Sequence, residues 1–316
     1  MKRQDSGKVV SRVILLFSLS VFMAVLLLAS GCIEDVEELQ VESHSIEPEG
    51  AESADVVLDM ISGDMSIAGG SENLIDAEFR YNVASWKPEI EYEVREGWGN
   101  LDVRQPEMQG VMSGSGGRNE WDLRLNKEMP IDLKADLENG NIGLAPGNSR
   151  LKKLDITVKN GNINAELTGD QPLLEELMIK HSNGNVVLDL TGDFPSVSSV
   201  TLDSINGNID TELSGSYASL NHVEISQKIG NIATDLTGNW SKDADVEVTL
   251  NSGKITLKLP RQTGVYVEVV TPTHVEAEGF RREGIAYVND AYGKSEVTLN
   301  IKASSDIGII ELMLAD

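Results

Sequence analysis

Hydrophobic and polar positions alternate along this chain in a phrase that recurs at nearly constant spacing. The sequence has NGNINAELTG from Asn160, NGNVVLDLTG from Asn183 and NGNIDTELSG from Asn206, with diverged copies from Ile229 and Ser252. Aligned on their glycines, the copies are 21 residues apart once and 23 residues apart thereafter: Gly140, Gly161, Gly184, Gly207, Gly230 and Gly253. A period in this range, kept this closely, is typical of repeat architectures.

The same hydrophobic positions recur on both sides of each glycine from Gly161 to Gly253. Isoleucine or valine stands two positions after the glycine and leucine six positions after it, and aliphatic residues stand five and seven positions before it. A period of two predicts a β-strand with one buried face. Each repeat is therefore predicted to contain two short strands that meet at a tight corner.

Two all-β architectures fit this pattern. Asn-Gly between alternating strands is a strong hairpin signal, which would give an antiparallel meander. A repeat of about 23 residues also matches one turn of a single-stranded parallel β-solenoid, or β-helix. We favour the solenoid, because stacked turns place each side chain on its equivalent about 4.8 Å away and so require the same residue in the same column. Asparagines one position after the glycines would then form a ladder of side-chain amides: Asn162, Asn185, Asn208 and Asn231.

The first 32 residues have the features of an export signal. Four basic residues precede an apolar run from Val13 to Leu28, and the segment ends in LASGC at Cys32, the single cysteine of the chain. This ending resembles the lipobox of prokaryotic lipoproteins, which implies cleavage after Gly31 and lipid attachment at Cys32. An uncut signal anchor is the alternative. The lipoprotein interpretation predicts an exported protein held on the outer face of the cell membrane.

Charge narrows the possible partners. The chain has 26 basic and 51 acidic residues, and without the leader 22 basic and 50 acidic residues remain, a net charge of about −28. Such a surface repels nucleic acid and anionic lipid headgroups, so neither is an expected partner. It suits basic partners or cations, although a generally acidic proteome would produce the same balance.

The remaining chain divides into three predicted parts. Residues 32–53 are rich in Glu and Ser and are expected to form an acidic tether. Residues 54–135 show alternating strands without the repeat and are predicted to be an N-terminal β domain. Residues 136–316 are predicted to form the parallel β-solenoid.

Several phrases are similar to those of a known family. LIDAEFRYN from Leu74, SWKPEIEYEV from Ser85, LDVRQP from Leu101 and NEWDLRLNKEMPIDL from Asn119 resemble the N-terminal domain of the toast-rack family. The later repeats, with GVYVEV from Gly264 and AYVNDAY from Ala286, resemble the β-helical remainder of that family. The resemblance implies a parallel β-solenoid in an envelope-associated protein, and relatives include regulators of the response to cell-wall antibiotics. This chain departs from them in its Asn-Gly-Asn corners and in its lipobox, which replaces the multi-span membrane segment of the regulators.

One polar column is a candidate binding surface. Five positions after the glycines stand four carboxylates, before Lys258 ends the run: Glu166, Asp189, Glu212 and Asp235. On an outward face at about 5 Å spacing they would attract a basic partner or a divalent cation, since hard cations take oxygen ligands. A solvated polar face that discourages edge aggregation is the simpler explanation, and a carboxylate pair for glycoside cleavage is a third.

A second column, ten positions after the glycines, is aromatic: Phe194, Tyr217 and Trp240. Aromatic rings at one corner would stack on a glycan or a protein partner, or would pack against one another to cap the corner.

The sequence contains no other motif that indicates an enzyme. The four histidines show no metal-ligand spacing, and the P-loop, G-x-S-x-G and G-x-G-x-x-G motifs are absent. We therefore expect a non-enzymatic, lipid-anchored envelope protein without cofactor or metal. Its solenoid is expected to provide a surface for binding a protein or glycan partner, for assembly or for regulation. The alternative is a carbohydrate-active β-helix enzyme such as a polysaccharide lyase.

Overall fold

The computed structural model describes residues 32–107, 110–113, 116–270 and 274–315 of the 316-residue chain. The predicted leader, residues 1–31, lies outside the described residues. The described chain is all-β, apart from one 3₁₀ turn, η1 (Ala84–Trp86). Among the described residues, no helix has the length and hydrophobicity of a membrane span.

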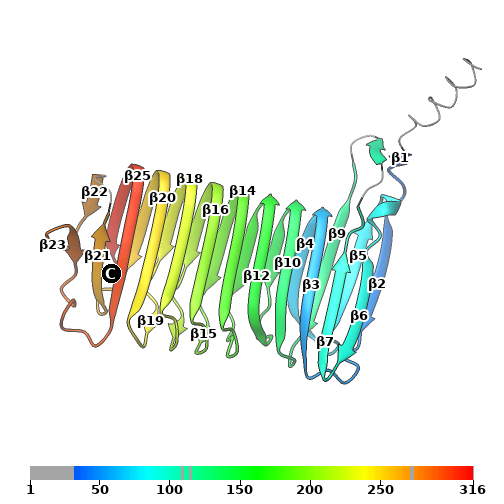
Figure 1. The fold of residues 1–316 in the computed structure, drawn as a ribbon, viewed down its shortest axis with the longest axis horizontal. Helices are drawn as coiled ribbons and strands as arrows, with labels where there is room; N and C mark the ends of the chain where they lie inside the picture. Colours follow the sequence, from blue (N-terminus) through cyan, green and yellow to red (C-terminus); the bar gives the residue numbers. More distant parts are fainter. Residues whose placement is uncertain (1–31, 108–109, 114–115, 271–273, 316) are drawn as a thin grey trace, which may run out of the picture.

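The repeats form the long central part of a large, mostly parallel sheet (Figure 1). Each repeat contributes strands that run up to the corner and away from it, either as a pair or as one long bent strand. The strands are β10 (Ile131–Asn139), β11 (Ile142–Ala145), β12 (Leu151–Asn160), β13 (Ile163–Leu167), β14 (Glu176–Leu190), β16 (Ser199–Glu212), β18 (His222–Asp235) and β20 (Ala244–Leu259). Neighbouring repeats pair in parallel, not as an antiparallel meander, and their glycines lie opposite one another, as Gly184, Gly207, Gly230 and Gly253 do.

The parallel stacking extends beyond the repeats that the sequence reveals. At the N-terminal end, β3 (Ser53–Ser62) pairs with β10 and β4 (Asp64–Ser71) pairs with β11, both in parallel. At the C-terminal end, β25 (Thr298–Leu314) pairs with β20 and places Gly308 opposite Gly253. Gly63 and Gly308 thus continue the row of corner glycines at its two ends. The predicted boundary at residue 135 lies inside β10, and the two predicted domains share one sheet.

Strands without the repeat cover both ends. The N-terminal ones are β1 (Cys32–Asp35), β2 (Gln40–Ile46), β5 (Ile75–Tyr81), β6 (Glu89–Arg95), β7 (Trp98–Arg104), β8 (Gly110–Ser113) and β9 (Asn119–Asn126). The C-terminal ones are β21 (Gly264–Val269), β22 (His274–Ala277), β23 (Arg281–Glu283) and β24 (Ala286–Val288). Strand β2 lies within residues 32–53, which the sequence indicates to be a tether, and it pairs antiparallel with β5. Its polar and half-buried residues show no hydrophobic alternation, so the sequence pattern does not reveal it.

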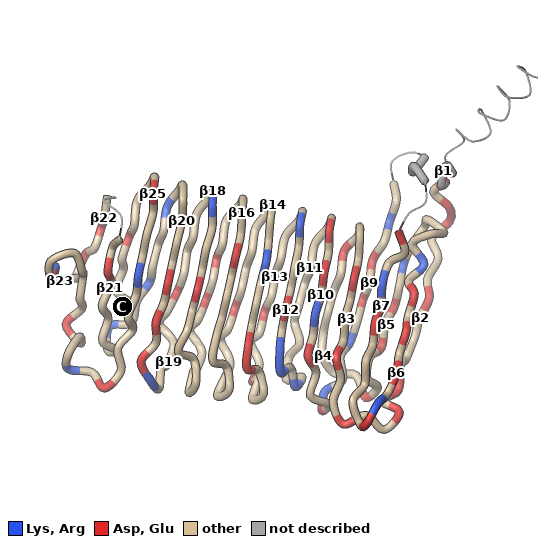
Figure 2. Tube along the Cα trace, viewed as in Figure 1, with Lys and Arg blue, Asp and Glu red and all other residues tan. Residues whose placement is uncertain are grey.

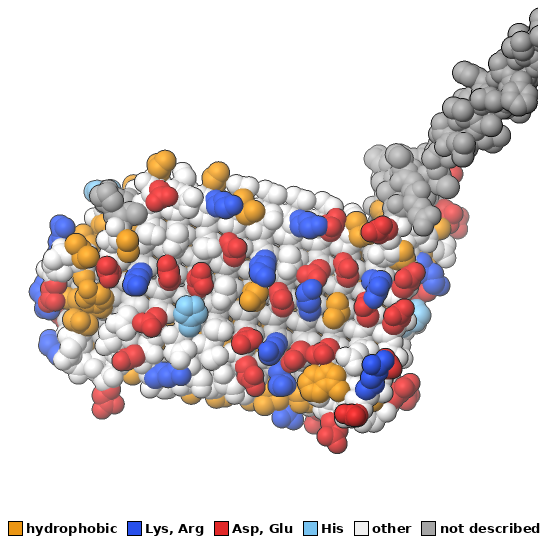
Figure 3. All heavy atoms as spheres, in the orientation of Figure 1, with side chains coloured by type: hydrophobic (Ala, Val, Ile, Leu, Met, Phe, Trp, Pro, Cys, Tyr) orange, Lys and Arg blue, Asp and Glu red, His pale blue; other side chains and the backbone are white. Residues whose placement is uncertain are grey.

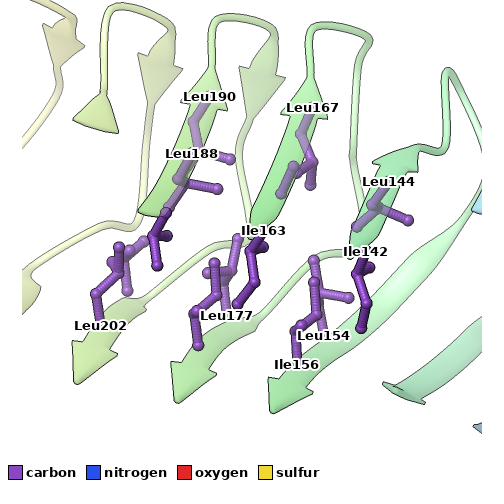
Figure 4. Packing of buried hydrophobic residues seen from close by; sticks show 14 of the residues in the cluster. Ile142, Leu144, Leu154, Ile156, Ile163, Leu167, Leu177, Leu188, Leu190 and Leu202 are labelled. Carbon is purple, nitrogen blue, oxygen red and sulfur yellow. The ribbon is translucent and has the colours of Figure 1, made fainter. Parts of the chain in front are cut away.

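The core lies between the two layers of strands that meet at the corner. The hydrophobic columns predicted from the sequence point into it, and Figure 4 shows Ile156, Leu177 and Leu202 from one layer facing the side chains of the other, such as Ile163 and Leu188. These residues are all at most 1% exposed. Burial of repeated columns stabilises each repeat through its neighbours, because no repeat encloses a core alone.

Asparagine side chains form the predicted ladder along the corner. The Oδ1 atom of Asn185 accepts hydrogen bonds from the backbone N and the Nδ2 of Asn208, both at 3.1 Å, and Asn208 accepts from Asn231 in the same way. The ladder starts at Asp64, which accepts from Asn141, and ends where Asn231 accepts from the backbone N of Lys254. Because each amide satisfies the backbone of the next repeat, the ladder fixes the register of the corner.

Candidate functional site

The four predicted carboxylates form one column on the strands that follow the corner. Glu166 lies opposite Asp189, Asp189 opposite Glu212 and Glu212 opposite Asp235, while Lys258 follows Asp235. Glu166 and Glu212 are exposed, and the two aspartates are half-buried. The neighbouring leucines, such as Leu213, are buried, so the column faces outward as predicted.

The two aspartates of this column have opposite electrostatic environments. Burial, and then the charges of Glu212 and Glu166, raise the pKa of Asp189 above its ordinary value. Burial acts on Asp235 in the same direction, but hydrogen bonds from Lys258 and Thr237 outweigh it and lower the pKa. Lys258 Nζ lies 2.7 Å from Asp235 Oδ2. The available negative charge of the column is thus concentrated on Glu166, Asp189 and Glu212.

The aromatic column lies inside the protein, which corrects its prediction as part of a binding surface. Phe194, Tyr217 and Trp240 are 0%, 1% and 5% exposed. They follow one another on the short strands β15 (Asp193–Phe194), β17 (Ser216–Tyr217) and β19 (Asn239–Trp240), with ring centres 5.8 and 5.1 Å apart. The Tyr217 hydroxyl donates to the carbonyl of Leu190, and Trp240 Nε1 donates to that of Leu236. The rings cap the core opposite the glycine corner, because indole and phenol can be buried once their polar atoms are bonded.

A polar column inside the corner also has a structural role. His181, Ser204 and Gln227 lie on consecutive repeats, three positions before the glycine, and all are buried. His181 Nε2 donates to the carbonyl of Gly161 at 2.9 Å, since that oxygen can only accept, and Nδ1 lies 3.1 Å from Ser204 Oγ. These bonds join adjacent corners and leave the histidine out of contact with solvent.

The sequence does not predict a surface groove at the N-terminal end of the sheet. Strands β6, β7, β3, β10 and β12 line it, and its volume is about 530 Å³. The carboxylates Glu91, Glu93, Asp102, Asp55, Asp132 and Asp155 lie along it, with Lys134 and Lys153 and the ring of Tyr92. The groove requires the pairing of β3 with both β7 and β10, strands that are far apart in the chain. For this reason no sequence spacing indicates it.

Side chains at the groove are held by specific contacts. Trp98 Nε1 donates to Asp55 Oδ2 at 3.0 Å, and Lys152 Nζ lies 5.8 Å from the centre of the Trp98 ring. Burial raises the pKa of Asp132, whose Oδ1 atom is buried and has no hydrogen-bond partner among the described residues. The groove is thus an acidic concavity with the ring of Tyr92 in its lining, which suits a ligand that carries amines or basic side chains.

Apart from the acidic groove, charges of both signs are distributed over the strand faces. Figure 2 shows acidic and basic residues on most strands, and Figure 3 shows both signs spread over the length of one face. In the part of the chain that the structure describes, no group of three or more His, Cys, Asp and Glu residues is arranged to hold a metal ion. The structure does not bring the predicted site residues together: the aromatic column is buried, and Cys32 begins β1, far along the chain from the carboxylate column.

Comparison with known proteins gives a family match for part of the chain. The model of the N-terminal domain of toast_rack, DUF2154, matches residues 35–181. The match covers the N-terminal strands and the first repeats, in agreement with the continuous sheet. No curated protein matches this chain.

Three solved structures are similar over 88% of this chain. They are a putative cell adhesion protein from Clostridium sporogenes (24% identity, TM-score 0.34, 100% of that chain) and putative adhesins from Bacteroides fragilis (14%, 0.45, 99%) and Parabacteroides merdae (10%, 0.24, 99%). Because all three TM-scores lie below 0.5, no property of these proteins is transferred to this chain. The family model and the phrases that resemble this family agree: residues 35–181 match the N-terminal domain of the toast-rack family.

Proposed function

We propose that this chain is a non-enzymatic, lipid-anchored protein of the cell envelope, whose parallel repeats form a β-solenoid that captures a basic partner. One observation carries the proposal. The same outward position bears a carboxylate on four consecutive repeats, from Glu166 to Asp235, while the interior columns stay hydrophobic. A regular row offers distributed attraction, whereas a hydrolase or lyase concentrates acid, base and metal at one place.

The anchor is tested by Cys32→Ser. Lipid attachment requires the thiol, so the variant is expected to leave the membrane fraction or to accumulate as an uncut precursor. The measurement is membrane fractionation together with the mass of the N-terminal peptide. Normal processing with unchanged membrane retention would contradict the anchor.

The binding surface is tested with an oligolysine peptide as the probe, titrated calorimetrically at low salt. The variant is Glu166→Gln, Asp189→Asn and Glu212→Gln together, which removes three charges from the column and spares the Asp235–Lys258 pair. The control is Glu176→Gln, Asp203→Asn and Glu224→Gln, which removes three exposed charges from different rows of the other strand layer. We expect the column variant to weaken binding at least about tenfold more than the control, since each removed charge contributes roughly 0.5–1 kcal/mol at low salt. Equal weakening would show that the probe senses net charge only.

A further inference from the structure

The corner has a composition unlike the rest of this acidic surface. Around the five glycines from Gly161 to Gly253 and around Gly308, the 18 residues at positions −2, −1 and +1 contain three lysines and one acidic residue, Asp306. The lysines are Lys159, Lys228 and Lys254, and all three are exposed. Lys159 pairs with Glu138 and Lys254 with Glu311, and Lys228 and Asp306 have opposite charges, so this strip, which we call the corner ridge, is close to neutral.

Exposed isoleucines occupy one end of the corner ridge. Ile205, Ile229, Ile307 and Ile309 are 37%, 59%, 72% and 38% exposed. Ile229 and Ile307 lie in the column that holds asparagine in the earlier repeats, with Ser252 between them, and Ile309 lies beside Lys254. Figure 3 shows hydrophobic side chains along the upper edge at this end. The asparagines of this column also bond to one another, as Asn206 Nδ2 donates to Asn183 Oδ1 at 2.9 Å. Isoleucine at position 229 gives up such a bond without gaining burial inside the protein.

The ridge and the start of the described chain lie on the same side of the molecule. In Figure 1 the corner forms the upper edge, whereas β15 and β19 lie at the lower edge. Strands β20 and β25 at one end, and β1 with β8 at the other, reach furthest along the upper edge in this view. A flat surface laid on this edge would therefore meet the isoleucine end of the ridge and β1 together.

The distance between the predicted anchor and the body is short. The backbone N of Glu37 donates to the carbonyl of Asn82 at 2.7 Å, which holds residue 37 against the end of β5. Glu37 stands five positions after Cys32, and five extended residue steps span at most about 17 Å. A lipid on Cys32 would thus keep the folded body close to the bilayer, where one edge must face the headgroups.

We infer that the corner ridge is a membrane contact: its isoleucine end, Ile229, Ile307 and Ile309, inserts at the surface of the bilayer that holds the Cys32 lipid. The inference rests on the proposed lipid anchor. Apolar side chains on a nearly neutral strip are suited to the boundary between headgroups and acyl chains. The acidic strand layers are then left free to face partners in solution.

The test uses the full-length protein, purified from membranes and reconstituted into vesicles of phosphatidylcholine. A nitroxide label is introduced by Ser252→Cys, between the two isoleucines, or by Ser241→Cys, next to β19 at the opposite edge. Collision rates with oxygen and with a water-soluble nickel complex report the depth of each label. We expect the label at Ser252→Cys to collide more often with oxygen than with the nickel complex, as a label at the headgroup boundary does. The label at Ser241→Cys is expected to show the collision rates of a label in water. Aqueous values at both positions would overturn the inference.

A second set of variants separates the ridge from the anchor. Ile229→Ser with Ile307→Ser is expected to shift the label at Ser252→Cys to the aqueous value, because serine already occupies this column. Ile285→Ser, which changes an isoleucine of 61% exposure away from the ridge, is the matched control and should leave the depth unchanged. An equal shift in the control would also contradict the inference. The mass of the N-terminal peptide reports the lipid independently, so an unmodified Cys32 would refute the anchor and not the ridge.

Discussion

At Gly207 the backbone φ angle is +133°, and a Cβ atom built there would lie 1.4 Å from the carbonyl oxygen of Gly184. The same conflict recurs along the row, with Gly161 facing Gly140 at 1.6 Å and Gly253 facing Gly230 at 1.6 Å. Two separate restrictions thus act on each corner glycine, because a side chain would strain the backbone and would also collide with the previous repeat. Glycine is therefore the residue that repeats most strictly, because no other residue fits the stacked corner.

Gly207→Ala is expected to destabilise the protein by about 3 kcal/mol or more, since the colliding atom belongs to the backbone and cannot rotate away. Chemical denaturation monitored by circular dichroism measures the change. Gly143→Ala is the control, because a Cβ at Gly143 meets nothing within 4 Å, and its effect should stay within about 1 kcal/mol. Similar losses in both variants would show that the corner packing is not the cause.

Two aspartates of the carboxylate column are expected to respond to pH in opposite ways. The pKa of Asp189 is raised in the folded state, so its ionised form destabilises the folded protein at a pH above the folded-state pKa. This destabilisation disappears as the pH falls below the pKa of the unfolded state. Asp189→Asn should therefore increase the free energy of unfolding at pH 7 by a few tenths of a kcal/mol, with no gain near pH 3.

The pKa of Asp235 is lowered, so its contribution is favourable above the unfolded value and is lost as the pH falls through the folded pKa. Asp235→Asn should decrease the free energy of unfolding at pH 7, and the difference from wild type should vanish in acid. Urea denaturation of both variants from pH 3 to pH 7 measures the two trends. The same sign for both variants at pH 7 would contradict the assigned environments.

Among the elements, alternation along the long bent strands decides which side chains face the core. In β16, the sequence SVTLDSINGNIDTE has buried residues at alternate positions up to the corner and again after it. The corner glycine lets the strand turn while the hydrophobic side chains on both sides of the turn still face the core. One strand therefore contributes to both layers. Strand β2 shows the opposite case: its residues alternate only between exposed and half-buried positions, and tertiary pairing with β5 alone makes it a strand.

Leu213→Ala removes an interior side chain of 0% exposure, and we expect a loss of about 2–5 kcal/mol in the free energy of unfolding. The neighbouring outward residue gives the comparison: Glu212→Ala should change stability by less than about 0.5 kcal/mol. Denaturant titrations of the two variants measure this difference. Equal costs would mean that the two faces of the strand are reversed.

Over the whole molecule, each middle repeat is paired on two sides, whereas the terminal strands are paired on one. β16 lies between β14 and β18, but among the described residues β23 pairs only with β24, and β6 only with β7. The free edge of β6 carries three exposed glutamates, Glu89, Glu91 and Glu93, and like charges along an edge oppose pairing with another sheet. The elongated sheet is in this way closed at its ends by short or charged strands.

Hydrogen exchange is expected to follow this arrangement. Amides of β14, β16 and β18 should exchange at least about 100-fold more slowly than those of β22 and β23, because opening a middle repeat breaks two interfaces. Mass spectrometry of peptic fragments measures the exchange. Uniform protection from β3 to β25 would indicate that the molecule unfolds as a single unit.

The sequence by itself determined the repeat, the corner glycines, the asparagine ladder and the inward and outward columns. These features are local, or they recur at a fixed interval, so the regular spacing of residues such as Gly184 and Gly207 carries the information about their contacts. The toast-rack resemblance likewise rests on short phrases of the chain.

Tertiary structure alone decided what depends on irregular connections. Strands β5–β9 separate β4 from β10, and strands β21–β24 separate β20 from β25, so the outer members of the glycine row, Gly63 and Gly308, fall outside the 23-residue spacing. The acidic groove, the burial of Phe194, Tyr217 and Trp240, and the shared edge of the isoleucines and β1 depend on the same long-range pairing. In a periodic sequence, residues one repeat apart are predicted to be in contact. Where a long segment without the repeat is inserted, the strands before and after it also pair, but no regular spacing in the sequence indicates that they do.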